Sequence, residues 1–233
     1  MKLELCAAST EAIRLAKELN FDRIELCQNL EQGGITPSLG MIEYALANDL
    51  ETHVLIRPRS GGFFYSEDEI EVMLRDVLVC KEIGVKGVVV GALNQLGEID
   101  VHFLSEVMGK SAGMEVTYHR AFDDVLDWKK SIDVLIQHNV NRVLSSGLAR
   151  NVDIGFPILK EMIAYSSEKI DIMVGGGVNA GNVGKIKKEL LPDAIHFSGT
   201  LKHQQDEDSL FSESVLKVDK LKIIRVLESL SLI

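Results

Sequence analysis

Two short segments, LELC at Leu3–Cys6 and RIELC at Arg23–Cys27, each place a glutamate two residues before a cysteine. A carboxylate can serve as a general acid or base, and a thiolate can act as a nucleophile or bind a soft metal ion. If both segments are neighbouring β-strands in level register, the two cysteines lie about 5 Å apart. Cys6 and Cys27 are therefore candidate Cu(I) ligands, and two inert buried thiols are the structural alternative.

Three further side chains are candidates for acid–base catalysis. His119 lies in the segment TYHRAFDDV, and an imidazole ordinarily titrates near neutral pH. Asp123 follows in the same segment and is placed to orient the imidazole. Glu25 is the other candidate acid or base. An isolated strand histidine is often only structural, so this assignment belongs to a second hypothesis, in which the protein is an enzyme.

Two arginines and two glycine-rich loops suggest an anion site. The segment IRPRSGGFFYS carries arginines that can bind a carboxylate or phosphate, followed by glycines and aromatic residues that could cover a ligand. The segments MVGGGVN and HFSGT offer backbone N–H groups of the kind that bind phosphate, although plain tight turns would look the same. The residues that we assign to anion binding are Arg57, Arg59, Gly176, Gly177, Ser198 and Gly199.

The elements that would position these residues alternate regularly along the chain. Short apolar runs rich in β-branched residues predict strands, and longer amphipathic stretches between them predict helices. Ser66–Glu69 has the form of a capping box, and Asp100 and Asp127 suit helix N-caps. The predicted strands are Lys2–Cys6, Arg23–Cys27, Thr52–Arg57, Gly87–Leu93, Met114–Phe122, Arg142–Gly147, Ile170–Gly175 and Ala194–Ser198.

About eight strand–helix units in 233 residues favour the α/β class and a single closed (β/α)8 TIM-type barrel spanning residues 1–233. A doubly wound open sheet is the structural alternative. No Pro/Ser-rich linker divides the chain. After residue 200 we expect a polar loop and then a closing helix over roughly Val215–Leu230.

In a barrel, alternate strand residues face the interior. Applied here, this alternation places both Glu-x-Cys pairs inside, with the cysteines at the end that carries the site and the glutamates one layer below. Buried charges must pair with each other or meet water or a ligand. Either an ion-pair network or a polar pocket at the carboxyl ends of the strands would give the predicted interior side chains their partners. These side chains include Glu4, Glu25, Arg57, Glu115, His119, Asp171 and His196.

The overall composition limits the classes of partner. The net charge of −10 disfavours nucleic acid and anionic membranes, and no apolar run approaches the roughly 18 residues of a membrane span. Three cysteines are too few and too odd in number for a disulfide framework, and no signal peptide is visible. We therefore expect a reduced, cytoplasmic protein whose partner is a copper ion or a small anionic ligand. We also expect a homo-oligomer, with a dimer favoured.

Several motifs together resemble the copper homeostasis protein CutC family. In chain order they are ELC twice, GGITPS, IRPRSGGFFYS, GVVVGAL, YHRAFD, RVLSSG, GGGVN and HFSGT, spanning Leu3 to Thr200. The resemblance implies a cytoplasmic TIM-type barrel with a role in copper homeostasis. It also implies Cu(I) bound at two strand-end cysteines, which match Cys6 and Cys27. No residue singled out above requires a metal, and an enzyme acting on a small, perhaps phosphorylated, anion would use the arginines, His119 and the glycine loops.

Overall fold

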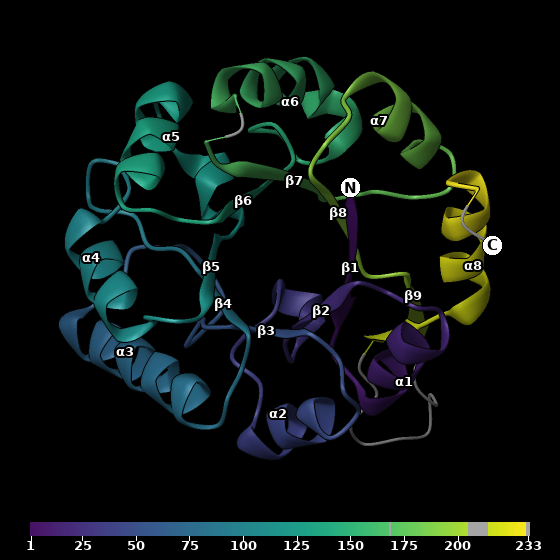
Figure 1. Ribbon diagram of the computed structural model, residues 1–233, viewed down its shortest axis with the longest axis horizontal. Helices are drawn as coiled ribbons and strands as arrows, with labels where there is room; N and C mark the ends of the chain where they lie inside the picture. The colour runs from purple at the N-terminus through teal and green to yellow at the C-terminus, as the bar shows by residue number, and fades with distance from the viewer. Residues whose placement is uncertain (168, 205–213, 232–233) are drawn as a thin grey trace.

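Eight parallel strands close into a barrel in the computed structural model, which describes residues 1–167, 169–204 and 214–231. The strands pair in sequence order from β1 to β8, and β8 pairs with β1. Figure 1 shows the helices as an outer ring around the strands, with α8 between α7 and α1. The predicted TIM-type barrel is confirmed, and the open-sheet alternative is wrong.

The bounds of the elements are as follows. The barrel strands are β1 (Lys2–Ala7), β2 (Arg23–Leu26), β3 (Thr52–Leu55), β4 (Gly87–Val90), β5 (Glu115–Tyr118), β6 (Arg142–Ser145), β7 (Asp171–Gly175) and β8 (Ala194–Phe197). The α-helices are α1 (Thr10–Glu18), α2 (Leu39–Leu46), α3 (Glu67–Glu82), α4 (Val101–Lys110), α5 (Trp128–Gln137), α6 (Val152–Ser166), α7 (Val183–Glu189) and α8 (Lys220–Ser229). The remaining elements are the 3-10 helices η1 (Leu30–Gln32) and η2 (Arg120–Asp124) and the strands β9 (Thr200–Gln204) and β10 (Ser214–Val218).

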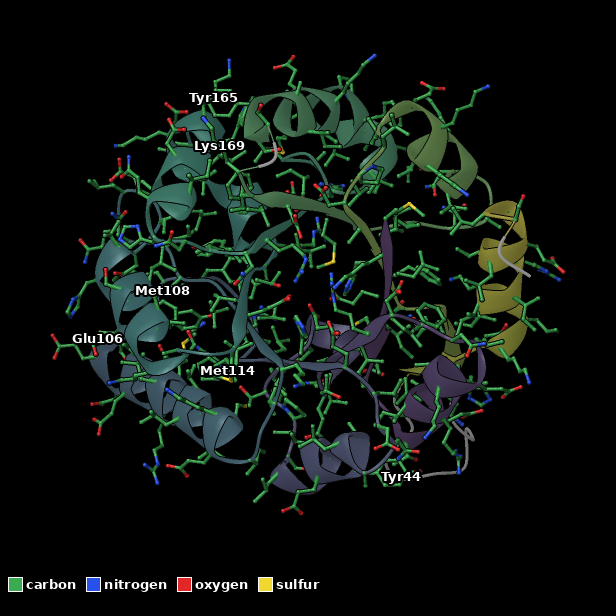
Figure 2. The ribbon with its side chains drawn as sticks, in the orientation of Figure 1. Tyr44, Glu106, Met108, Met114, Tyr165 and Lys169 are labelled. Carbon is green, nitrogen blue, oxygen red and sulfur yellow. The ribbon has the colours of Figure 1, made fainter. Side chains whose placement is uncertain are left out.

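The core separates into a shell between strands and helices and a lumen inside the barrel. Leu5, Ile24 and Val54 face outward and pack in the main hydrophobic cluster beneath the helices. Cys6 and Cys27 belong instead to a small lumenal cluster. Figure 2 shows side chains that project into the interior of the ring, and a second lumenal cluster joins Leu144, Met173 and Ala194. The inward and outward sides follow the predicted alternation.

Helix starts agree with their sequence signals. The Ser66 hydroxyl accepts a hydrogen bond from the Glu69 N–H, and the Glu69 carboxylate accepts one from the Ser66 N–H, which forms the predicted capping box of α3. Asp100 caps α4 and Asp127 caps α5, since each carboxylate accepts backbone N–H groups of the first turn. These caps fix where each helix begins behind its strand.

The segment after β8 differs from the sequence prediction. Residues predicted as the start of the closing helix form β10, an antiparallel partner of β9. The helix begins only at Lys220, because Asp219 caps it by accepting the Lys222 N–H. The valines of the segment SVLKV are β-branched, which favours a strand, although its apolar positions fit either element. The predicted polar loop falls largely on residues 205–213, outside the described residues.

Within the described part of the chain, no helix is both long and apolar enough to traverse a bilayer.

Candidate functional site

A cavity of about 570 Å³ opens at the carboxyl ends of the barrel strands, where barrel proteins place their sites. We call it the mouth cavity. Side chains from β1, β2 and β8 line its base, and the loops after β3, β5, β7 and β8 line its walls. The lining residues that matter below are Cys6, Glu25, Arg57, His119, His196 and Lys222. Its volume suits a small organic ligand.

Cys6 lines the base of this cavity, and the fully buried Cys27 lies next to it. Their Sγ atoms are 3.7 Å apart, and the Cys6 thiol also points to the Glu25 carboxylate, with 3.9 Å between sulfur and oxygen. Barrel register pairs Cys6 with Glu25 and Ala7 with Leu26. Cys6 and Cys27 are thus staggered, and Glu25 lies level with Cys6. The expectation that the glutamates lie one layer below the cysteines therefore holds for Glu4 and is wrong for Glu25.

Glu4 is the centre of a buried charge network below the cysteines. Its carboxylate forms an ion pair with Arg23 and lies 2.7 Å from His196 Nδ1, and all three side chains are buried. Burial alone would raise the pKa of Glu4, but the hydrogen bond and charge of His196 and the charge of Arg23 hold it well below its usual value. Glu4 is therefore ionised, and it fixes the orientation of the His196 ring through Nδ1.

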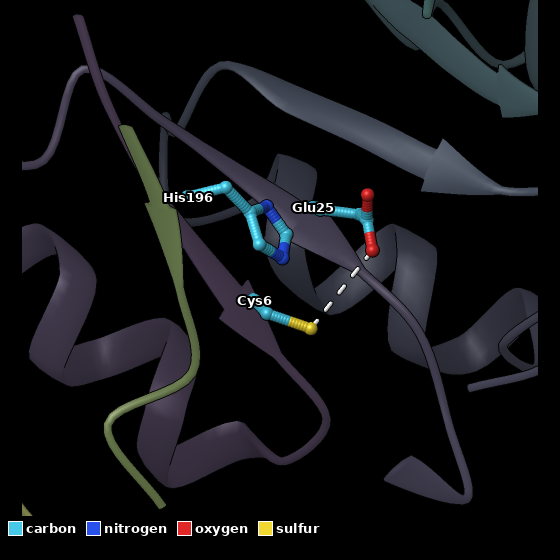
Figure 3. Close-up of side chains that lie close together, drawn as sticks. All are labelled: Cys6, Glu25 and His196. Atoms are coloured by element: carbon cyan, nitrogen blue, oxygen red, sulfur yellow. Dashed lines mark hydrogen bonds between the residues drawn. The ribbon is translucent and has the colours of Figure 1, made fainter. Parts of the chain in front are cut away.

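Glu25 and His196 also affect each other's ionisation. Burial raises the pKa of Glu25 to about 7, an effect that the positive charge of His196 only partly offsets. Burial would lower the pKa of His196, but the charge of Glu25 and the hydrogen bond to Glu4 raise it above its ordinary value. Figure 3 shows Cys6, Glu25 and His196 converging from three strands, and one ligand atom of each lies within 4.8 Å of the others.

His119 lines the cavity, but Asp123 does not orient it. The Ala121 N–H donates to His119 Nδ1, and Nε2 has no hydrogen-bond partner among the described residues. Burial, with the nearby charge of Arg57, lowers the pKa of His119 to about 3, so the ring is neutral. Asp123 instead binds Arg120 and the Ser146 hydroxyl. The chain turns into η2 directly after β5, which directs Asp123 away from the imidazole.

The two candidate arginines lie in different surroundings. Arg57 is buried in the cavity wall, where its Nη atoms donate to three backbone carbonyls while Nε has no partner among the described residues. Arg59 lies outside the cavity lining and forms an ion pair with Glu69, with a further hydrogen bond to the Phe64 carbonyl. Of the two arginines, only Arg57 lines the mouth cavity.

The glycine loops after β7 and β8 both reach the cavity. Gly176 and Gly177 have φ of +97° and +86°, which a residue with a side chain adopts only with strain. A Cβ on Gly176 would also come within 3.1 Å of the Arg120 guanidinium carbon. Ser198 and Gly199, in the loop after the neighbouring strand β8, also line the cavity, as does Lys222. Both glycine loops therefore border the mouth cavity.

Three buried polar side chains of the lumen escaped the sequence reasoning. Arg23 and Arg142 begin β2 and β6, and His53 is the second residue of β3, and all three are buried. Extending the same alternation two residues back from Glu25 and Leu55 would have placed Arg23 and His53 inside. His196 was placed inside without a role, although it links Glu4 to the cavity.

Comparisons with known proteins agree with one another. The chain matches the CutC family model over residues 1–200. A CutC protein of Glaesserella parasuis is 38% identical with full coverage of both chains, and one of Bacteroides thetaiotaomicron is 40% identical over 84% of this chain and 80% of its own length. The structure of a Streptococcus agalactiae CutC protein, named for a suggested role in copper homeostasis, superposes with a TM-score of 0.79 at 32% identity, covering 84% of this chain and 98% of that one.

Proposed function

The chain belongs to the CutC family, and from this premise we propose that it binds Cu(I) in the mouth cavity through the thiols of Cys6 and Cys27. The observation that carries this proposal is the 3.7 Å separation of the two sulfur atoms. With metal–sulfur bonds of about 2.3 Å, one ion can contact both. Thiolates are the soft ligands that Cu(I) prefers.

His196 is the proposed third ligand. Glu4 already holds its Nδ1, which leaves the Nε2 lone pair available on deprotonation. A carboxylate bound to the far nitrogen is the usual support of a metal-binding histidine, because it fixes the ring orientation. Glu25, whose carboxylate is a hard ligand, is better suited to accept a proton than to bind Cu(I).

Copper binding should release protons. The hydrogen bond to Cys27, together with burial, raises the pKa of the Cys6 thiol well above its ordinary value, so the metal must displace a proton from sulfur. Glu25 Oε1 lies 3.9 Å from that sulfur and has a pKa of about 7. We therefore expect the Cu(I) affinity to rise with pH.

The test is an anaerobic titration of the reduced protein with Cu(I) against a chromophoric chelator of known affinity. The Cys6→Ser/Cys27→Ser double variant should bind at least about a hundredfold more weakly, because each thiolate supplies a metal bond. Cys80→Ser is the matched control, since Cys80 is a buried core residue of α3. An affinity unchanged in the double variant would refute the proposal.

A second candidate function is favoured by the size of the mouth cavity, which far exceeds what one metal ion needs. We propose that it also accepts a small anionic molecule and that the protein acts on this molecule as an enzyme. Among the described residues, Arg57 Nε and His119 Nε2 have no hydrogen-bond partner, and Lys222 also lines the cavity, which supports an anion there. Glu25 is the candidate acid or base, because its pKa of about 7 lets it exchange protons at neutral pH.

Thermal-shift measurements with a panel of phosphorylated and carboxylated metabolites test this second candidate. A ligand should raise the midpoint of unfolding of the parent protein, and Lys222→Met should reduce the shift. Lys220→Met is the control, because Lys220 pairs with Glu18 outside the cavity lining. If no anion stabilises the parent, or if Lys222→Met leaves the shift intact, the enzyme hypothesis loses its support.

A further inference from the structure

A second polar cluster lies at the opposite end of the barrel, at the amino-terminal ends of the strands. Glu51 directly precedes β3, His53 lies within β3, and Glu115 begins β5. One ligand atom of each lies within 4.8 Å of the others. We call these three residues the floor cluster. They take no part in the mouth cavity, so the proposed function does not account for them.

His53 is the unusual member of the cluster. Its side chain is fully buried, and neither ring nitrogen has a hydrogen-bond partner among the described residues. A buried polar group without a partner costs about 1–3 kcal/mol and calls for a physical explanation. The fold makes room for the ring, because a Cβ on Gly87 would lie 2.6 Å from it. The imidazole is therefore accommodated in a specific place yet left unpaired.

The His53 ring is aimed at the two carboxylates. Nε2 lies 3.5 Å from Glu51 Oε1 and 3.8 Å from Glu115 Oε2. Both separations exceed a good hydrogen bond. They fit two ligand atoms on one ion, because metal bonds of about 2.0–2.2 Å keep such atoms within about 4.4 Å of each other. The geometry leaves a gap between three donor atoms.

The surroundings allow a cation to enter. The side chains of Glu51 and Glu115 are 36% and 39% exposed, so they can rotate and meet ions from solvent. Two cations lie nearby. Lys2 Nζ is 4.0 Å from Glu51, and Arg142 Nη2 is 2.9 Å from Glu115. Arg142 also lies 3.6 Å from Asp171 and donates to Thr117, so it keeps partners if Glu115 turns to a metal.

We propose that the floor cluster binds a divalent transition metal of the Zn²⁺ class, with His53 Nε2, Glu51 and Glu115 as ligands and water completing the shell. One imidazole and two carboxylates form a donor set that Zn²⁺ accepts, and they lack the thiols that select Cu(I). The ion ties the loop before β3 to β3 and β5. Its role is structural, because amino-terminal ends of barrel strands serve stability.

The experiment is a Zn²⁺ titration of the Cys6→Ser/Cys27→Ser protein against a chromophoric competitor. The missing thiols make the result independent of the Cu(I) proposal. We expect one equivalent of Zn²⁺, with X-ray absorption showing only nitrogen and oxygen neighbours and a raised unfolding midpoint. His53→Gln and Glu51→Gln in this background should each weaken binding at least about tenfold. His102→Gln and Glu43→Gln, exposed on α4 and α2, are the matched controls and should not weaken it.

Absence of Zn²⁺ binding overturns the proposal, and so does binding that survives both ligand variants. If His53→Gln fails to fold, Glu51→Gln decides, because Glu51 lies outside the strands and is partly exposed. Loss of Zn²⁺ binding in that folded variant supports the site, and unchanged binding refutes it.

Discussion

Glu25 combines burial with a pKa of about 7, so its ionisation acts against folding. Since an unfolded glutamate titrates near 4.5, the folded pKa is raised, and the stability linked to the neutral form is complete below about pH 4.5. It is lost as the pH rises through about 7. Glu25→Gln should therefore stabilise the protein at pH 8, by on the order of 3 kcal/mol relative to its effect at pH 4.5.

Denaturant unfolding of the two proteins at several pH values measures this difference. Glu43→Gln, on the surface of α2, is the control and should show no such trend. A Glu25→Gln effect that stays constant between pH 4.5 and 8 would contradict the assigned ionisation.

Glu4 is expected to behave in the opposite way, because its charge is paired. Replacing it by glutamine leaves the buried Arg23 guanidinium without a counter-charge, which should destabilise the fold by about 3–5 kcal/mol. Glu11→Gln, an exposed change in the first turn of α1, provides the comparison. Chemical denaturation of both variants measures the effect, and a Glu4→Gln protein as stable as the control would show that the network contributes little.

For single residues, the sequence predicts whether a side chain faces the lumen or the helices, but it does not predict which side chains it contacts there. Period-two alternation places Glu4, Glu25 and Cys6 inside, as the structure does. The stagger between β1 and β2 sets Cys6 opposite Glu25, and that offset comes from the tilt required to close the barrel. It is a property of the whole sheet, so two strand sequences alone do not contain it.

Among the elements, α3 shows how far local signals reach. Its start is set by the reciprocal bonds between Ser66 and Glu69, and Glu69 also binds Arg59 from the loop after β3. Ser66→Ala should lower the free energy of unfolding by about 1 kcal/mol. The Cu(I) affinity of this variant should be unchanged, since Ser66 and its partner Glu69 do not line the mouth cavity. A change in affinity would instead show that this loop couples the helix start to the cavity.

Cap-defined elements were predictable because a cap involves neighbours in sequence. The β9–β10 pair was not, because a strand in this tail is stabilised by its partner across the intervening residues. The apolar residues of SVLKV fit a helix or a strand when considered alone, and Asp219 then starts the helix later than periodicity suggests. The strand predicted over Met114–Phe122 ends at Tyr118, where the His119 ring accepts a hydrogen bond from the Ala121 N–H and the chain continues as η2.

At the scale of the whole molecule, the barrel keeps two polar ends apart, with the Glu4–Arg23 pair between them. If the mouth binds Cu(I) and the floor binds Zn²⁺, the two events should be nearly independent, because the sites share no ligand. We expect the Cu(I) affinity at saturating Zn²⁺ to stay within about twofold of its value without Zn²⁺. Competition titrations with both metals measure this, and a larger shift would reveal coupling through the lumen.

The expected homodimer stays a prediction, which light scattering tests.

The pairing of β1 with β8 also determines how late during translation the barrel can close. Glu4 and His196 are 192 positions apart, so a ribosome elongating at about 5–20 residues per second needs roughly 10–40 s between them. During that interval the nascent chain already exposes both Glu-x-Cys segments, while the imidazole that joins Glu4 has not been translated. The mouth cavity is therefore one of the last parts of the molecule to form. In a chain that stalls before β8, the thiols of Cys6 and Cys27 stay exposed to solvent.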